Sequence, residues 1–247
     1  MKQLGDKEPF FIGWAAMPRP MQGFMLGLAA CLVVFAGVAA YVLGATQGDP
    51  GNGGYLGSAQ ATGILEARPY PVLYVTQSDR FASGTALILS GAGKNGVQRF
   101  AEPLDGKMVR AEGVRMQRGN LDGIVLSSLN AVDAKGALPE RRSLGRWRLT
   151  GEICDGKCLN GTMRPGRGLA HKACANLCLL GGVAPVFVST DKVDGTEFFL
   201  MGDASGGPLD QDVLDHTAVL IEVEGQIEQR GSLKLFLIDP TTIRIAR

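Results

Sequence analysis

The sequence has few of the residues from which catalytic and nucleic-acid-binding sites are usually built. Only two histidines occur in 247 residues, aromatic residues make up 6% of the chain, and the formal net charge is +1. A nearly neutral, aromatic-poor chain lacks the basic stacking surface that nucleic acids require. No segment combines a nucleophile, a base and an oxyanion site, and no haem or iron–sulfur ligation pattern occurs. We therefore expect a protein that is neither an enzyme nor a nucleic-acid binder.

Two glycine-rich segments have the outline of cofactor or catalytic motifs without the context that those motifs need. Gly91-Ala-Gly93-Lys-Asn-Gly96 fits G-x-G-x-x-G, but Pro103 interrupts the segment where a dinucleotide-binding helix would run. The segment 202–208, GDASGGP, is similar to the trypsin-type nucleophile sequence with one inserted alanine, which would displace Ser205 from its oxyanion donors. Both segments are predicted to be loops. His216 lies in a polar segment that we expect to be a solvated turn.

Charge is also absent from a long segment close behind the N-terminus. Residues 23–45, GFMLGLAACLVVFAGVAAYVLGA, contain no charged side chain. A helix rises about 1.5 Å per residue, so this segment is long enough to span a hydrocarbon core about 30 Å thick. Basic residues precede the segment and none follows until Arg68, which by the positive-inside bias places the N-terminus in the cytoplasm. The sequence predicts a cytoplasmic tail over 1–20 and a transmembrane helix over 21–45.

A cleaved signal peptide is the competing interpretation of the same segment. Its apolar region would usually be about 7–15 residues long and would end at a small-x-small cleavage site. Here the apolar run is longer, and Pro18 and Pro20 precede it. We therefore expect an uncleaved single-pass anchor in a bacterial inner membrane, because the glycine- and alanine-rich composition is typical of bacteria. The domains that follow would lie in the periplasm, where disulfides persist.

The remaining sequence divides into two β-rich regions separated by polar segments. Residues 46–60 are rich in glycine and turn-forming residues without hydrophobic periodicity, which is typical of a flexible linker. A second linker is predicted over 137–148, a polar segment that contains Pro139. The linkers delimit a first domain at 61–136 and a second at 149–247, each long enough for one small hydrophobic core.

Both domains contain short β-rich runs bounded by glycine, aspartate and asparagine, a pattern typical of an all-β sandwich or barrel. These runs cover 71–75, 85–89, 108–114 and 123–129 in the first domain and 147–154, 183–188, 198–201, 219–227 and 233–237 in the second. Beyond the N-terminal segment, helix is expected only at 171–180 and, as a single turn, near 209–216.

Three short motifs recur in the same order in both domains, which indicates an internal duplication. The most specific is a hairpin in which Gly113-x-x-x-Gln117-Arg118-Gly119-x-Leu121 corresponds to Gly225-x-x-x-Gln229-Arg230-Gly231-x-Leu233. The other pairs are Thr62-Gly63-Ile64 with Thr150-Gly151-Glu152 and Leu104-Asp105 with Leu214-Asp215. Five short strands with a helix and hairpins fit a small OB-like barrel, whose closure removes exposed sheet edges. The predicted fold is all-β: one N-terminal transmembrane helix followed by two tandem OB-like β-barrels.

Four of the five cysteines fall in the second domain, as two Cys-x-x-x-Cys pairs with a histidine shortly before the second pair. They are Cys154, Cys158, Cys174 and Cys178, and the histidine is His171; Cys31 lies in the apolar segment. In an oxidising compartment we expect structural disulfides that join the two pairs, since an i,i+4 bridge on one helix is awkward. Two interpretations stay open beside this one. Four thiolates, or three with the histidine, could bind zinc or copper, and one cysteine pair could undergo thiol–disulfide exchange.

The cysteine segment also carries a resemblance to a known group of proteins. The run GEICDGKC…HKACANLCLLGGVAPVFV, within roughly residues 149–245, resembles the small OB-like Cys/His domains of bacterial membrane-anchored periplasmic proteins. Their pattern is a strand ending in Cys, a second Cys nearby, and His-x-x-Cys-Ala-x-x-Cys-x-x-Gly-Gly before a strand. Those proteins mostly lack an assigned activity, so the resemblance implies a fold and a compartment but no catalytic residue. The first domain lacks the four cysteines and the histidine.

The sequence predicts a non-enzymatic accessory or scaffolding subunit of a larger membrane complex, with respiratory and photosynthetic assemblies as candidate hosts. Its expected partners are other membrane-protein subunits and the lipid bilayer, with no cofactor. A local basic stretch made by Arg141, Arg142, Arg146 and Arg148, with Trp147, could meet anionic headgroups or an acidic partner. The alternative is a periplasmic metal-handling protein for copper or zinc, or a thiol-redox protein, that uses Cys154, Cys158, His171, Cys174 and Cys178.

Overall fold

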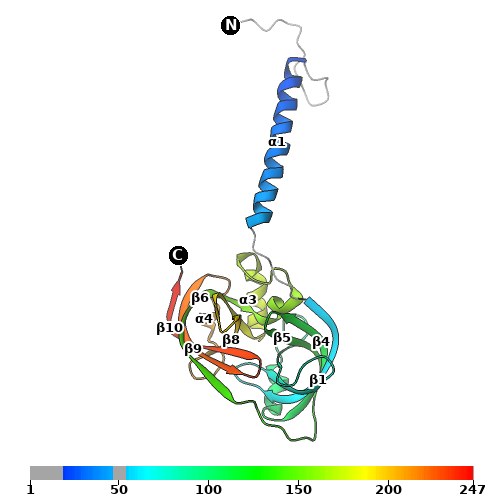
Figure 1. Cartoon of the computed structure of the whole chain (residues 1–247), viewed down its shortest axis with the longest axis vertical. Helices are drawn as coiled ribbons and strands as arrows, with labels where there is room; N and C mark the ends of the chain where they lie inside the picture. Colours follow the sequence, from blue (N-terminus) through cyan, green and yellow to red (C-terminus); the bar gives the residue numbers. More distant parts are fainter. Residues whose placement is uncertain (1–18, 47–53, 247) are drawn as a thin grey trace. The chain divides into compact units, whose positions relative to one another are not determined.

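The computed structural model describes residues 19–46 and 54–246. The chain divides into two compact units, one within residues 1–49 and one formed by residues 50–247 (Figure 1). The first unit contains one long helix, α1 (Arg19–Thr46). Within it, Met21–Ala45 has a mean hydropathy of 2.5 and is long and apolar enough to cross a membrane. By length and composition this helix suits an anchor or a signal sequence. Most of the predicted cytoplasmic tail lies outside the described residues.

The second unit is mostly β and contains two closed sheets of five strands each. The first sheet has the strand order β1-β2-β3-β5-β4 and the second the order β6-β7-β8-β10-β9. In both sheets the third and fifth strands are parallel and the other pairs are antiparallel. The strands are β1 (Gly54–Glu66), β2 (Val72–Ser78), β3 (Ala86–Ser90), β4 (Met108–Arg118), β5 (Leu121–Ala131), β6 (Arg141–Asp155), β7 (Pro185–Val193), β8 (Thr196–Asp203), β9 (Ile221–Arg230) and β10 (Leu233–Ile245).

Short helical segments join the third and fourth strands in both sheets. They are α2 (Gln98–Ala101) with η1 (Glu102–Leu104) in the first sheet and α4 (Gln211–Leu214) in the second. Only the second sheet carries helical segments between its first and second strands, namely η2 (Cys158–Thr162), η3 (Leu169–His171) and α3 (Lys172–Leu180). The helix predicted at 171–180 and the turn near 209–216 are therefore confirmed, whereas α2, η1 and η2 were not predicted.

The motifs that recur in the sequence occupy equivalent positions in the two sheets. Gly63 in β1 and Gly151 in β6 both lie so close to the second strand that an added Cβ would be 2.1 Å and 2.2 Å from a carbonyl oxygen. Gly113 in β4 and Gly225 in β9 approach the fifth strand in the same way, at 2.0 Å and 2.4 Å. Only glycine lets two backbones come this near. The two β domains are therefore similar in structure as well as in sequence.

The two sheets pack against each other and share a hydrophobic core. Each sheet encloses its own buried cluster, one around Leu73 and Leu87 and the other around Phe199 and Phe236. A further cluster joins side chains of both sheets, among them Ile88 from β3 and Leu200 and Leu235 from the second sheet. The closed sheets consequently pack against each other within one unit (Figure 1).

Both predicted linkers contain strand residues. Strand β1 begins at Gly54, within the predicted linker 46–60, and β6 begins at Arg141, within the predicted linker 137–148. The first halves of these strands are largely exposed and carry glycine or arginine, so they lack the alternation of apolar and polar residues that identifies a strand. Backbone pairing of β1 with β4 and of β6 with β9 holds them in place instead.

The hairpin of each sheet reaches across to the third strand of the other. At the turn between β4 and β5, the amide of Asn120 donates to the carbonyl oxygen of Phe198 in β8 at 3.3 Å. At the turn between β9 and β10, the hydroxyl of Ser232 accepts from the backbone N–H of Ala86 in β3 at 2.9 Å. Each hairpin turn therefore forms a hydrogen bond with the third strand of the other sheet.

The arginine before each hairpin turn also contacts an aromatic ring of the other sheet, Phe198 in β8 and Tyr74 in β2. The guanidinium of Arg118 lies 5.9 Å from the ring centre of Phe198, and that of Arg230 lies 6.0 Å from the ring centre of Tyr74. Arg230 also pairs with Glu66, a nearly buried carboxylate that accepts a hydrogen bond from the hydroxyl of Tyr74 at 2.9 Å. Burial, and then the charge of Glu66, hold the pKa of Tyr74 well above its ordinary value.

Candidate metal centre

The cysteine segment, residues 156–184, connects β6, the first strand of the second sheet, to β7, the second strand, and contains α3. Strand β6 ends at Asp155, and η2 begins three residues later at Cys158. His171 precedes α3, and Cys174 and Cys178 lie within it. The spacing i, i+3, i+7 places these last three residues on one face of a helix. That face is turned toward Cys158. Helix α3 ends at Leu180, the end of the predicted range 171–180, and its C-cap Gly181 is followed by Gly182 with a φ of +86°.

Three thiols converge at this point. The Sγ atom of Cys158 lies 3.9 Å from the Sγ atoms of both Cys174 and Cys178. Cys158 and Cys178 are buried, while Cys174 is partly exposed. The ammonium group of Lys94 donates to the Sγ atom of Cys174 at 2.8 Å and has a raised pKa because of that hydrogen bond. A hydrogen bond with Cys178, burial and the charge of Asp155 raise the pKa of Cys158.

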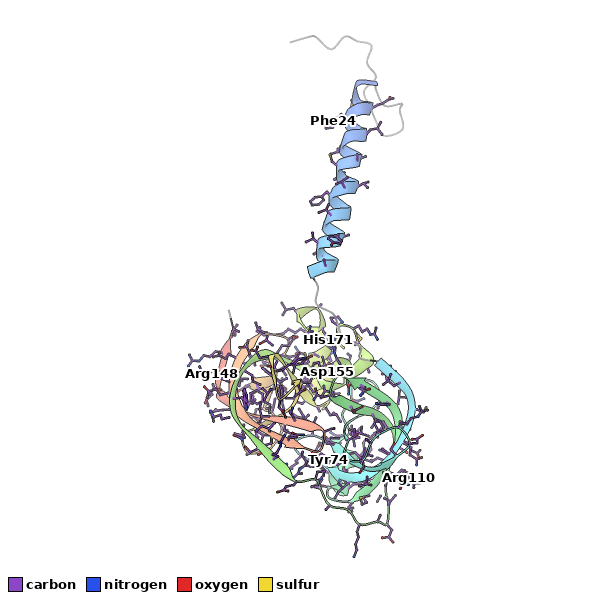
Figure 2. All side chains as sticks on the ribbon, viewed as in Figure 1. Phe24, Tyr74, Arg110, Arg148, Asp155 and His171 are labelled. Atoms are coloured by element: carbon purple, nitrogen blue, oxygen red, sulfur yellow. The ribbon has the colours of Figure 1, made fainter. Side chains whose placement is uncertain are left out.

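A histidine and a carboxylate complete the cluster. Nε2 of His171 lies 2.9 Å from Oδ2 of Asp155, and Oδ1 of the same carboxylate accepts from the backbone N–H of Cys158 at 2.7 Å. The side chain of Asp155 is 0% exposed and that of His171 is 3% exposed. Figure 2 labels both residues close together in the second unit. Such a pair orients an imidazole and selects the nitrogen that carries its proton.

The structure brings together four of the five residues that the sequence nominated. Ligand atoms of Cys158, His171 and Cys174 lie within 4.8 Å of one another, and so do those of Asp155, Cys158 and Cys178. Cys154 belongs to neither group. It is buried in the core that the two sheets share, and burial raises the pKa of its thiol. Asp155 was not nominated, although its position next to Cys154 in the first Cys-x-x-x-Cys pair was visible in the sequence.

The disulfides predicted from the cysteine spacing are not formed in the structure. All five cysteines are free thiols. A disulfide needs two sulfur atoms about 2.05 Å apart, whereas Cys158 lies 3.9 Å from each of its two neighbours. Cross-pairing of both arms would also need Cys154, which packs elsewhere.

The glycine loop 91–96 packs against the cysteine segment. The backbone N–H of Gly96 donates to the carbonyl oxygen of Gly181 at 2.8 Å, and an added Cβ on Gly96 would be 1.9 Å from the oxygen of Gly182. The ammonium of Lys157 donates to the carbonyl oxygens of Gly91 and Gly93, the latter at 2.7 Å. The predicted loop is therefore present. Its contacts hold the cysteine segment against the first sheet. Helix α2, which follows it, is only four residues long.

The second glycine-rich segment is a turn built around a carboxylate. Oδ1 of Asp203 accepts hydrogen bonds from the backbone and hydroxyl of Ser205 and from the backbone N–H of Gly207. Burial acts against the charge, but these hydrogen bonds together lower the pKa of Asp203. The loop predicted at 202–208 is confirmed over 204–208, while Gly202 and Asp203 belong to the end of β8. His216 follows α4 and is half-buried.

The arginines of the predicted basic stretch are paired within the second unit. Arg146 and Arg148 both bind Glu224, at 3.1 Å and 2.5 Å. Arg141 binds Glu66 and Glu228, and Arg142 lies 3.6 Å from Asp194. These contacts, which cross from β6 mainly to β9, give each arginine of the predicted basic stretch an acidic partner within the unit. Arg148 lies on the outer side of the second sheet (Figure 2).

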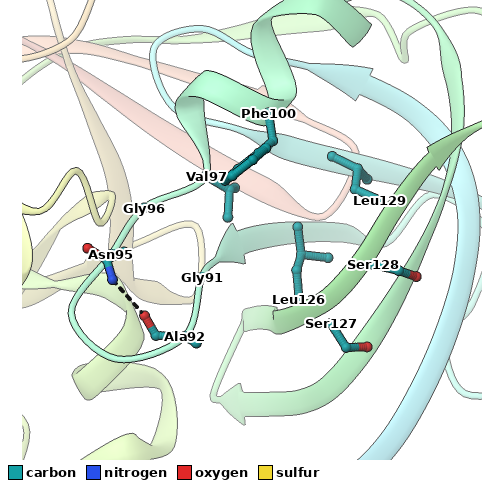
Figure 3. A pocket seen from close by; sticks show the side chains of 10 residues that line it. All are labelled: Gly91, Ala92, Asn95, Gly96, Val97, Phe100, Leu126, Ser127, Ser128 and Leu129. Atoms are coloured by element: carbon teal, nitrogen blue, oxygen red, sulfur yellow. Dashed lines mark hydrogen bonds between the residues drawn. The ribbon is translucent and has the colours of Figure 1, made fainter.

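A cavity of about 400 Å³ lies beside the glycine loop (Figure 3). Phe100 and Val97 form one wall, and Leu126 and Leu129 from β5 face them across the opening. A neighbouring hollow of about 560 Å³ shares Phe100 and extends to Leu180 at the end of α3. The two hollows are mostly apolar and share Asn95, Gly96 and Phe100 in their lining, and we refer to them together as the Phe100 groove.

Comparison of the chain with protein-family models, with curated proteins and with solved structures found no match.

Proposed function

We propose that this protein is a non-enzymatic, single-pass membrane protein that acts as an accessory subunit of a larger membrane complex. In this proposal α1 stays as an uncleaved anchor in a bacterial inner membrane, and the β unit lies in the periplasm. The absence of basic residues between the apolar segment and Arg68 supports this orientation. Complexes of respiratory or photosynthetic electron transfer are the candidate hosts.

We also propose that both closed sheets are OB-like barrels. The order of first, second, third, fifth and fourth strand supports this assignment, and so does the parallel pairing of the third and fifth strands. A short helical segment before the fourth strand recurs in both domains. OB-like barrels commonly serve as compact binding modules. The shared core makes the pair of barrels a stiff support for a binding surface.

The observation that carries the proposal is the Phe100 groove. Phe100 is 71% exposed, Leu180 is 66% exposed, and both line the same hollow. Contiguous exposed apolar side chains in a folded protein mark a surface that another molecule covers. Aromatic side chains in such a surface supply large contact area at low entropic cost. We take the occupant to be an apolar segment of a neighbouring subunit in the same membrane.

Native-gel migration of complexes extracted in mild detergent tests this proposal. The full chain should migrate with at least one membrane-protein subunit in a fixed ratio, and Phe100→Asp or Leu180→Asp should release it as a smaller species. Ile245→Asp is the matched control, because Ile245 is also 66% exposed but lies at the end of β10, away from the groove. A wild-type chain that migrates alone, or an equal loss of partner in the control, would contradict the proposal.

A further inference from the structure

The segment between β6 and β7 contains metal-ligating side chains that a contact surface does not need. We propose that it holds one structural zinc ion in a four-ligand site made by Cys158, His171, Cys174 and Cys178. This inference does not depend on the proposed accessory role, since the site is formed entirely by the chain itself. It also differs from metal delivery, which needs a ligand set that a partner can reach.

The spacing of the sulfur atoms fits a metal better than a disulfide. Zinc–sulfur bonds are about 2.3 Å long, so two thiolates at a tetrahedral angle lie about 3.8 Å apart. The Sγ atom of Cys158 is 3.9 Å from that of Cys174 and 3.9 Å from that of Cys178. A disulfide from Cys158 to either of these neighbours would leave the other sulfur unbonded. Soft thiolates with an imidazole are a ligand set that zinc prefers.

The histidine is prepared to act as the fourth ligand. Asp155 is fully buried, and its Oδ2 atom lies 2.9 Å from Nε2 of His171. An acceptor at this position keeps the proton on Nε2, so Nδ1 carries the free lone pair that a metal needs. Metal-binding histidines in proteins usually donate their other ring N–H to a carboxylate in this way. Asp155 is thus a positioning residue, and its second oxygen fixes the backbone of Cys158.

The charges around the site balance a bound zinc ion. Binding Zn²⁺ to three thiols and a neutral imidazole releases three protons to solvent and leaves a site with one net negative charge. Lys94 already donates to the Sγ atom of Cys174 at 2.8 Å. Lys157 is adjacent to Cys158 in sequence and is anchored on the carbonyl oxygens of the glycine loop. With the carboxylate of Asp155 beside His171 the cluster carries two negative charges, which these two ammonium groups offset.

Burial indicates that the ion would serve structure. His171, Cys158 and Cys178 are all buried, and only Cys174 is partly exposed. Four protein ligands leave no open position for a substrate, which distinguishes structural from catalytic zinc sites. Zinc here would join η2 to α3 and thereby fix the segment that packs on the glycine loop. The first domain needs no such ion, because its first and second strands are joined by a short connection.

Metal analysis of the full chain, purified in detergent without reductant or chelator, tests the inference. About one zinc per chain is expected in the wild type. The same content is expected in Cys31→Ser, the matched cysteine control, because Cys31 lies in α1 and not in the cysteine segment. Cys174→Ser should reduce the zinc content at least about tenfold, and so should His171→Gln. Cys174 is the least buried of the three thiols, so its replacement is the one best tolerated by the fold.

Exchange with Co²⁺ in the wild-type chain provides a second measurement that needs no variant. A tetrahedral site with three thiolates should give strong sulfur-to-cobalt charge-transfer absorption, and added zinc should abolish it. Three results would overturn the inference. They are a metal-free wild type, whether or not Cys158 forms a disulfide, copper in place of zinc, or a zinc content in Cys174→Ser equal to that of the wild type.

Discussion

Replacing Gly96 by alanine tests whether the glycine loop holds the cysteine segment against the first sheet. An added Cβ would lie 1.9 Å from the carbonyl oxygen of Gly182 and 2.4 Å from its carbon, and both are backbone atoms that no side-chain rotation can move. The two segments must therefore separate, which breaks the hydrogen bond from Gly96 to Gly181. Overpacking costs about 1–3 kcal/mol and a lost hydrogen bond about 1 kcal/mol, so the free energy of unfolding should fall by about 2–4 kcal/mol.

Thermal unfolding of the full chain in detergent, followed by the circular dichroism of the β unit, measures this loss. For a unit of this size each kcal/mol shifts Tm by about 2–4 °C, so Gly96→Ala should lower Tm by about 4–16 °C. Gly54→Ala is the matched control, because its added Cβ would meet only the side chain of Arg164 at 3.8 Å. If the Tm of Gly96→Ala fell within about 1 °C of the control, the packing of the loop against Gly181 and Gly182 would be refuted.

Two further predictions concern the charged contacts between the sheets. Glu66→Gln removes the negative partner of Arg141 and Arg230 at a nearly buried position, so the free energy of unfolding from urea titration should fall by about 1–3 kcal/mol. The exposed carboxylate of Asp79 is the control, and a loss in Asp79→Asn as large as that in Glu66→Gln would contradict the reasoning. Because the pKa of Tyr74 is raised, the native state keeps a proton that the unfolded chain loses above the ordinary tyrosine pKa of 10.0. Stability should therefore decline as pH rises past about 10, and Tyr74→Phe should flatten that decline in urea midpoints taken between about pH 9 and 11.

Local patterning predicted most of the elements but not their edges. Runs such as 85–89 and 233–237 are short and largely apolar, which indicates strands, and the structure has β3 and β10 there. Strand β1 was missed as a whole, because no run before residue 71 was predicted; in its first half Gly54 and Gly57 contribute no side chain to an alternating pattern. The start of β6 was missed for the opposite reason, since its arginines face solvent and bind acidic residues of β9. In both cases the strand exists because a partner strand pairs with it, and pairing is not a local property.

The part of the candidate metal centre that depends on helical spacing could be predicted from the sequence. His171, Cys174 and Cys178 share a face of a helix by their spacing alone, and the structure confirms that helix. Which of Cys154 and Cys158 joins them depends on how the chain turns after β6, and both were equally eligible in the sequence. Lys94 could not be predicted at all, since it lies 80 residues from Cys174 and reaches it only through the packing of one sheet on the other.

The duplication and the cysteine segment together suggest how the two domains divide their work. The glycines at close backbone approaches and the hairpins that cross between sheets recur in both copies, so these features serve the fold that the copies share. The segment 156–184 has no counterpart in the first domain, yet it contacts that domain through Lys157 and Gly181. A feature present in one copy, built at the junction of both and flanked by an exposed apolar groove, is where a function specific to this protein would be added. Zinc at the base of that segment would set the position of Leu180, and thus the shape of the groove, without taking part in any reaction.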